Sequence, residues 1–252
     1  MNNLLFLKSA SNEDLLVLSD IILKDRDGEY RWTENLSTEE IYKQNYPHSV
    51  KEYLPELINE FRLFGGNSIA NMFRGEGPEY SEILHSVAKQ CKVKFSPSSP
   101  DELVEMNILQ KLFTDSLEKA SEEELKSMVK ELELPVTNFS RQAAITALMA
   151  AFRAGGFESY ILLVSVVNAV TRFIIGRGLS LAGNAMLTRV ASVMMGPVGW
   201  AVTALWTLID IAGPAYRVTV PAVIQIAYLR QKSFNPEGYL EGETKEDLQL
   251  NN

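Results

Sequence analysis

The chain has 252 residues, 24 of them basic and 32 acidic, which gives a net charge of −8, and it contains one cysteine. This length suffices for one large hydrophobic core or two modest ones, and a single cysteine excludes an intramolecular disulfide. The N-terminus has only a short apolar run before Lys8, so we expect no signal peptide and a cytoplasmic location, with peripheral association at the inner face of the cytoplasmic membrane as the alternative.

Charge is distributed unevenly along the chain. Residues 135–232 carry eight basic side chains and only two acidic ones, Glu158 and Asp210, whereas residues 1–134 carry 15 basic and 25 acidic side chains. A block with so few charges must bury most of its surface in a core or against a partner or a membrane. The eight cations are spread singly along the block, which argues against binding of nucleic acid.

The first part of the chain predicts short helices separated by turns. Ser11 followed by Asp14 forms a capping box, in which the hydroxyl accepts a hydrogen bond from the start of a helix. Residues 24–32 include Asp25, Asp27 and Gly28, but their spacing does not match a calcium loop, so we expect a surface turn there.

Helical spacing continues beyond this turn. Apolar residues three and four apart predict an amphipathic helix over residues 53–61, which ends at Gly65-Gly66. A second apolar stripe runs to Cys91, and the Ser/Pro-rich run at residues 96–100 predicts a boundary. Three further amphipathic helices are expected at residues 101–119, 121–134 and 139–154.

The low-charge block predicts four apolar helices, separated by glycine-containing breaks. We interpret Gly196-Pro197 as a tight connection between two of these helices. The tail from Ser233 is polar and acidic, which is typical of disorder. The four helices are expected at residues 157–175, 179–195, 198–212 and 215–232.

These patterns together predict an all-α protein. Its N-terminal region contains several helices, and an apolar, glycine-punctuated helical bundle follows. The expected divisions are an N-terminal helical region (1–96), acidic amphipathic helices (97–134), the apolar block (135–232) and a disordered acidic tail (233–252).

The environment of the apolar block stays open at the level of sequence. Ser165, Asn168 and Arg172 share one narrow stripe of an otherwise apolar helix, which fits either a core helix or a helix that faces lipid. The uncharged run at residues 190–209 has the length to cross a membrane. Against spanning, Gly196-Pro197 interrupts that run and arginines flank it, which favours a protein core or the membrane interface.

Three segments resemble a known family. They are FGGNSIANMFRGEG at residues 64–77, GPAYRVTVPAVIQIAYLRQK at residues 213–232 and the turn KDRDGEYRWTENLS at residues 24–37. The first two are similar to signature regions of the YaaW family of bacterial proteins, and the third resembles the small N-terminal module found in many members. The resemblance implies a bacterial protein on the cytoplasmic side, with a distant similarity to chaperones that assemble the ubiquinol–cytochrome c reductase.

A glycine-rich corner is the sharpest candidate for a ligand site. Backbone N–H groups at a helix start, with a guanidinium nearby, favour an anion or phosphate. A helix–loop–helix corner explains the same glycines and caps, and we favour that structural interpretation because no P-loop pattern is present. The candidate residues are Gly65, Gly66, Asn67, Ser68, Asn71 and Arg74.

A second group of polar residues and prolines lies along the last apolar helix and just before it. We interpret the group as structural or as contacts to a partner. Arg217 is expected to pair with Asp210 across the Gly213-Pro214 turn. The full set is Asp210, Tyr216, Arg217, Thr219, Pro221 and Gln225.

The side chains that usually carry catalysis do not form a recognisable set. His48, His85 and Cys91 lack metal-ligand spacing, and we expect no cofactor. The leading hypothesis is a non-enzymatic helical protein that binds a partner protein or an anionic membrane surface through its apolar block. The alternatives are an assembly or holding chaperone for an inner-membrane complex, and an anion sensor or enzyme that uses the Gly65–Arg74 corner.

Overall fold

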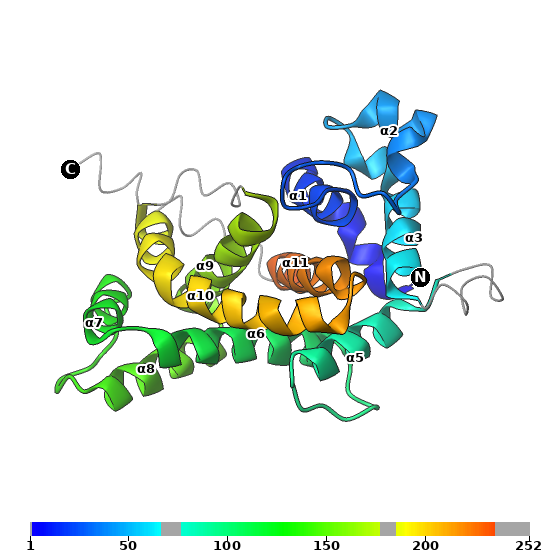
Figure 1. The fold of residues 1–252 in the computed structure, drawn as a ribbon. Helices are drawn as coiled ribbons and strands as arrows, with labels where there is room; N and C mark the ends of the chain where they lie inside the picture. The colour runs from blue at the N-terminus through cyan, green and yellow to red at the C-terminus, as the bar shows by residue number, and fades with distance from the viewer. Residues whose placement is uncertain (1, 67–76, 177–184, 235–252) are drawn as a thin grey trace, which may run out of the picture.

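The computed structural model describes residues 2–66, 77–176 and 185–234. Within these ranges the regular elements are helices, and the only β-type pairing among them is an isolated bridge between Lys24 and Tyr30. The predicted all-α fold class is therefore confirmed. In Figure 1 the helices surround α11, which lies near the middle of the molecule.

The N-terminal elements are short and stabilised by local hydrogen bonds. Ser11 caps α1, because its hydroxyl oxygen accepts a hydrogen bond from the backbone N–H of Asp14. The segment after α1 is a turn, as predicted, in which the Asp25 carboxylate accepts bonds from the backbone N–H groups of Asp27 and Glu29. The elements of this region are η1 (Asn2–Ser9), α1 (Asn12–Leu23), η2 (Leu36–Thr38), α2 (Glu40–Asn45), η3 (Val50–Tyr53) and α3 (Leu54–Gly65).

Four helices form the middle of the chain. The side chains of Ser121 and Ser140 cap α7 and α8. In Figure 1 α6 runs along the base of the molecule, with α5 at one end and α7 and α8 at the other. The bounds are α5 (Tyr80–Gln90), α6 (Asp101–Lys119), α7 (Glu122–Glu131) and α8 (Arg141–Ala154).

Three long helices complete the described chain, and one of them corrects a prediction. The helices are α9 (Gly156–Ile175), α10 (Ala185–Ala212) and α11 (Tyr216–Phe234). The predicted break at Gly196-Pro197 is wrong, because α10 continues through both residues.

The physical reason for the continuous helix is its buried stripe. Four buried residues follow one another at helical spacing, Val190, Met194, Val198 and Val202. The same side of the helix therefore faces the core before and after Pro197. Their burial offsets the backbone hydrogen bond that a proline removes. Gly196 has another role, since a Cβ there would lie 2.9 Å from the Glu124 carboxylate on α7.

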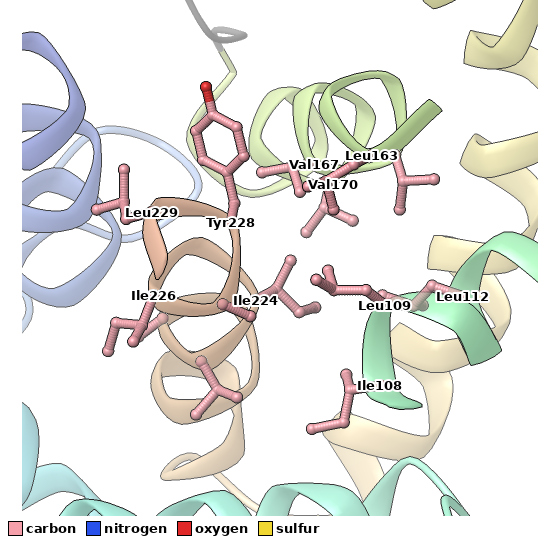
Figure 2. Packing of buried hydrophobic residues seen from close by; sticks show 14 of the residues in the cluster. Ile108, Leu109, Leu112, Leu163, Val167, Val170, Ile224, Ile226, Tyr228 and Leu229 are labelled. Carbon is pink, nitrogen blue, oxygen red and sulfur yellow. The ribbon is translucent and has the colours of Figure 1, made fainter. Parts of the chain in front are cut away.

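All three described ranges of the chain contribute to one core. Every residue of α11 from Val218 to Arg230 is buried, and the helix contacts α1, α3, α5, α6, α9 and α10. In Figure 2 the Ile224 side chain of α11 points toward apolar side chains of α6 and α9. A helix buried around its whole circumference must be supported on every side. The low charge of its sequence is thus explained by packing inside the protein.

Candidate interaction surface

The structure describes only the first part of the predicted Gly65–Arg74 corner. Gly65 is the last residue of α3, and a Cβ there would lie 2.5 Å from the Ile83 side chain, so this glycine allows α3 and α5 to approach closely. Gly66 follows in an extended conformation. Asn67, Ser68, Asn71 and Arg74 lie outside the described residues, and the anion site stays a prediction.

The far end of the same corner is held by a side chain that the sequence did not single out. Arg62 is buried on α3, and its guanidinium donates hydrogen bonds to the carbonyl oxygens of Gly77 and Pro78 and to the carboxylate of Glu79. A Cβ at Gly77 would lie 2.3 Å from the Arg62 backbone. Arg62 therefore joins the two ends of the corner and fixes the start of α5.

The predicted group around α11 does not form one site. The Tyr216 hydroxyl lies 2.8 Å from the Ser86 hydroxyl, Thr219 bonds back to the Ala215 carbonyl, and Pro221 packs in the core. Arg217 is exposed, whereas the side chain of Asp210 lies outside the described residues, so their pairing stays a prediction.

Gln225 connects α11 to α1 from inside the core. Its side chain is fully buried, and its amide nitrogen donates to the Asp14 carbonyl oxygen at 3.5 Å. Nearby, the Lys232 ammonium lies 2.8 Å from the Asp14 carboxylate. Both contacts tie the end of the chain to its beginning, which favours the structural interpretation of Gln225.

A buried ionic cluster, missed by sequence reasoning, joins four elements. The Arg230 guanidinium on α11 binds both carboxylate oxygens of Glu105 on α6, at 2.7 and 3.1 Å. The Tyr80 hydroxyl on α5 donates to Glu105 at 2.5 Å, and Arg230 also donates to the Asn3 carbonyl oxygen in η1. Arg230 lies over the Phe6 ring as well.

The electrostatics of this cluster indicate a structural role. Burial raises the pKa of Glu105 above its ordinary value, and the hydrogen bonds and charge of Arg230 oppose that rise. Burial beside Glu105 also raises the pKa of Tyr80 far above its usual range. The cluster is closed on all sides by its own partners, which stabilises the meeting of η1, α5, α6 and α11.

The residues considered for catalysis lie apart from one another in the chain's described part. Burial raises the pKa of the Cys91 thiol to about 12, so the thiol is protonated at neutral pH. His85 stacks on Phe95, and His48 is exposed. The described ranges hold no group of three or more His, Cys, Asp or Glu side chains arranged to bind a metal.

An outward stripe of α10 is the strongest candidate for an interaction surface. Two stretches, Glu158–Ile175 and Arg189–Thr207, have the length and apolar composition of membrane-crossing helices. In the first stretch 67% of the residues are buried inside the protein, but in the second only 41% are. One side of α10 is thus left exposed by the rest of the described chain, and its exposed residues are mainly small, such as Ser192, Gly196 and Thr203.

We call this stripe the α10 surface. The hydroxyl groups of its two threonines are satisfied within the helix, because Thr203 and Thr207 donate hydrogen bonds to the carbonyl oxygens of Gly199 and Thr203. Trp206 packs edge-on against Phe173 of α9 at its border. The α10 surface consists of Ser192, Gly196, Gly199, Thr203, Trp206 and Thr207, which are exposed or half-buried and recur at helical spacing.

Comparisons with known proteins find relatives along most of the chain. Residues 52–224 match a family described as ubiquinol-cytochrome C chaperone, and residues 2–32 match the domain of unknown function DUF3944. A UPF0174 protein of Helicobacter pylori strain J99 is 45% identical over 229 residues, covering 90% of each chain. No solved structure matches the chain.

A more distant relative confirms the resemblance to the YaaW family. The UPF0174 protein YaaW of Escherichia coli K12 is 28% identical over 228 residues, which cover 90% of this chain and 92% of YaaW. The match to residues 52–224 includes the whole α10 surface, and the match to residues 2–32 includes residues 24–32 of the segment that resembles the N-terminal module. The chain therefore belongs to the UPF0174 family and, through residues 52–224, to the ubiquinol-cytochrome C chaperone family.

Proposed function

We propose that this chain is a binding protein rather than an enzyme, and that a partner protein packs on the α10 surface. The observation that carries the proposal is the exposure of α10, whose apolar stretch is only 41% buried. The small residues of the stripe would let another helix approach the α10 backbone closely.

Crosslinking in living cells tests this proposal. A photoreactive amino acid is placed at Thr203 on the α10 surface or, as a matched control, at Thr146 on α8. Both threonines are exposed, and both donate their hydroxyl to the carbonyl oxygen four residues earlier. We expect a discrete crosslinked protein from position 203 alone. Equal crosslinking from both positions, or none from position 203, would contradict the proposal.

Assembly work is a second candidate function. It is supported by the match of residues 52–224 to the ubiquinol-cytochrome C chaperone family, which spans the described helices from α3 to α11. We propose that the partner on α10 is an immature subunit of an inner-membrane complex. Such a subunit exposes apolar helices before assembly, and the α10 surface would cover one of them.

Deletion and rescue separate this candidate from simple partner binding. Cells that lack the protein should contain less assembled ubiquinol–cytochrome c reductase, as measured by its haem absorbance. The wild-type chain and the Thr146→Glu variant should restore it, and Thr203→Glu should not. A normal level of the complex in deleted cells would reject the assembly function. The subunit should also co-purify with the chain after detergent extraction, which removes adsorbed lipid.

A further inference from the structure

A cavity of about 380 Å³ opens between α9, α10 and the turn that follows α1. Its size lies at the low end of the range for small-molecule sites, roughly 300–1,000 Å³. Two arginines stand at its rim, and apolar or small residues form its walls. The lining residues are Arg26, Ala169, Arg172, Phe173, Gly176, Met195 and Gly199.

The two arginines at the rim have no acidic partner among the described side chains. Both are exposed, and the Arg26 guanidinium lies over the Phe173 ring at 4.6 Å from its centre. Other arginines of the protein are used differently, since Arg62 pairs with a glutamate and so does Arg230. Arg26 and Arg172 therefore place two positive charges, neither of them in an ion pair with a described carboxylate, beside one mainly apolar cavity.

Arg26 forms no ion pair with a described residue, although Asp25, Asp27 and Glu29 lie in the same turn. Asp25 directs its carboxylate to the backbone N–H groups of Asp27 and Glu29, and so it serves the turn itself. Arg172 lies in the last turn of α9, where a positive charge also complements the helix dipole. Arg153 has the same position in the last turn of α8 but does not line this cavity, so it serves as a control.

We propose that this cavity binds the phosphate headgroup of an anionic phospholipid at a membrane surface. Arg26 and Arg172 bind the phosphate, because guanidinium groups match phosphate oxygens in geometry and charge. The walls formed by Ala169, Phe173 and Met195 receive the glycerol and the first acyl carbons. This site adds lipid recognition to partner binding and does not depend on it.

A lipid fits the cavity better than a free phosphate ion. The walls are mainly apolar, and a lone ion would leave them in contact with water. The cavity also borders the α10 surface, since Gly199 belongs to both and Trp206 packs on Phe173.

Vesicle flotation of the full-length protein tests the proposal. The vesicles contain either phosphatidylcholine alone or phosphatidylcholine with phosphatidylglycerol. Three variants are compared with the wild type: the double variant Arg26→Gln with Arg172→Gln, the control Arg153→Gln outside the cavity, and Gly199→Leu. A Cβ at Gly199 meets nothing within 4 Å, so the leucine should be accommodated and fill the cavity without changing the charge.

The proposal predicts binding of the wild type to the vesicles with phosphatidylglycerol only. Each arginine at the rim should contribute roughly fivefold to partitioning, so the double variant should bind about 25-fold more weakly. Gly199→Leu should also lose binding, whereas Arg153→Gln should remain close to the wild type. Equal circular dichroism melting curves would show that each variant is folded.

Three results would overturn the proposal. The first is wild-type binding by the Gly199→Leu variant, because a filled cavity cannot hold a headgroup. The second is an equal loss per removed arginine in Arg153→Gln and in the double variant Arg26→Gln with Arg172→Gln, which would indicate general charge attraction. The third is binding of soluble glycerol phosphate without binding of vesicles, which would assign the cavity to a soluble anion. Crosslinking at Thr203 reports on the partner separately from each of these results.

Discussion

Arg230 and Glu105 form a buried pair 125 residues apart in the chain, and the pair makes a stability prediction. Arg230→Met removes the guanidinium and leaves the Glu105 carboxylate buried without its partner. We expect the free energy of unfolding to fall by about 3–5 kcal/mol, as for other broken buried pairs. Urea unfolding measures the change, and the double variant with Glu105→Met should recover most of the loss. A variant as stable as the wild type would contradict the role of the cluster.

The same pair gives a pH dependence. The folded-state pKa of Glu105 lies above its ordinary value, so protonated Glu105 favours the folded state at low pH and this contribution is lost as the pH rises through the folded pKa. Without Arg230 that pKa should rise further. The destabilisation of Arg230→Met should therefore be larger near about pH 8 than near about pH 5. An equal loss at both pH values, measured by urea unfolding, would count against this assignment.

Sequence reasoning could not find this cluster, and the reason is physical. A capping pair such as Ser11 and Asp14 lies three residues apart, so local spacing predicts it. Arg230 finds Glu105 only because α11 and α6 pack together, and no local pattern records that contact. Arg230 stood within a family signature, but its role depends on the tertiary fold.

The α10 helix provides a test at the level of an element. Pro197 lies inside a continuous helix, so Pro197→Ala should restore a backbone hydrogen bond and raise the free energy of unfolding by about 1–2 kcal/mol. An interior proline costs roughly 3 kcal/mol, and the expected gain is smaller because the alanine buries less apolar surface. If Gly196-Pro197 were a tight turn, the same change would destabilise the protein. Thermal unfolding distinguishes the two outcomes.

Three glycines differ in what surrounds them, which predicts an order of effects. Gly77→Ala should destabilise most, because its new methyl group meets the Arg62 backbone at 2.3 Å. Gly65→Ala meets the flexible end of the Ile83 side chain and should cost less. Gly199→Ala meets open space in a helix and should stabilise by up to about 1 kcal/mol. Melting temperatures in any other order would contradict the described packing.

Helix positions were largely predictable, but their continuity and neighbours were not. The helices predicted at residues 121–134 and 139–154 lie close to α7 and α8, since the apolar spacing that predicts them is local. Gly196-Pro197 was misinterpreted because its residue types favour a turn, whereas the buried stripe from Val190 to Val202 keeps helical phase. The helical spacing of these buried residues indicates one continuous helix in place of the two that were predicted.

At the scale of the whole molecule, α11 holds the helices together. By composition α11 is less apolar than α9 or α10, yet it is buried from Val218 to Arg230. Arg230 pairs with Glu105, and the amide nitrogen of Gln225 donates to α1, whereas the Gln225 Oε1 atom is buried without a hydrogen-bond partner among the described residues. Composition predicted that the block is buried, but it could not predict which helix would be central.

This central position predicts a large effect from one core substitution. Ile224 is buried on α11 and points toward α6 and α9 in Figure 2. Ile224→Ala should lower the free energy of unfolding by about 2–5 kcal/mol through lost burial and a cavity. Unfolding followed by circular dichroism should show one transition shifted as a whole, since every region shares this core. Separate transitions for the two ends of the chain would contradict a common core.

The central claim, that the α10 surface is free in the isolated protein and covered in the cell, can be measured by thiol labelling. The native Cys91 is buried with a pKa of about 12, so a maleimide should report only an added cysteine. Thr203→Cys and Thr146→Cys should both react in the purified chain. Inside cells, we predict that the Thr203→Cys variant is protected and that the Thr146→Cys variant is labelled. Equal labelling of the two positions in cells would contradict the account.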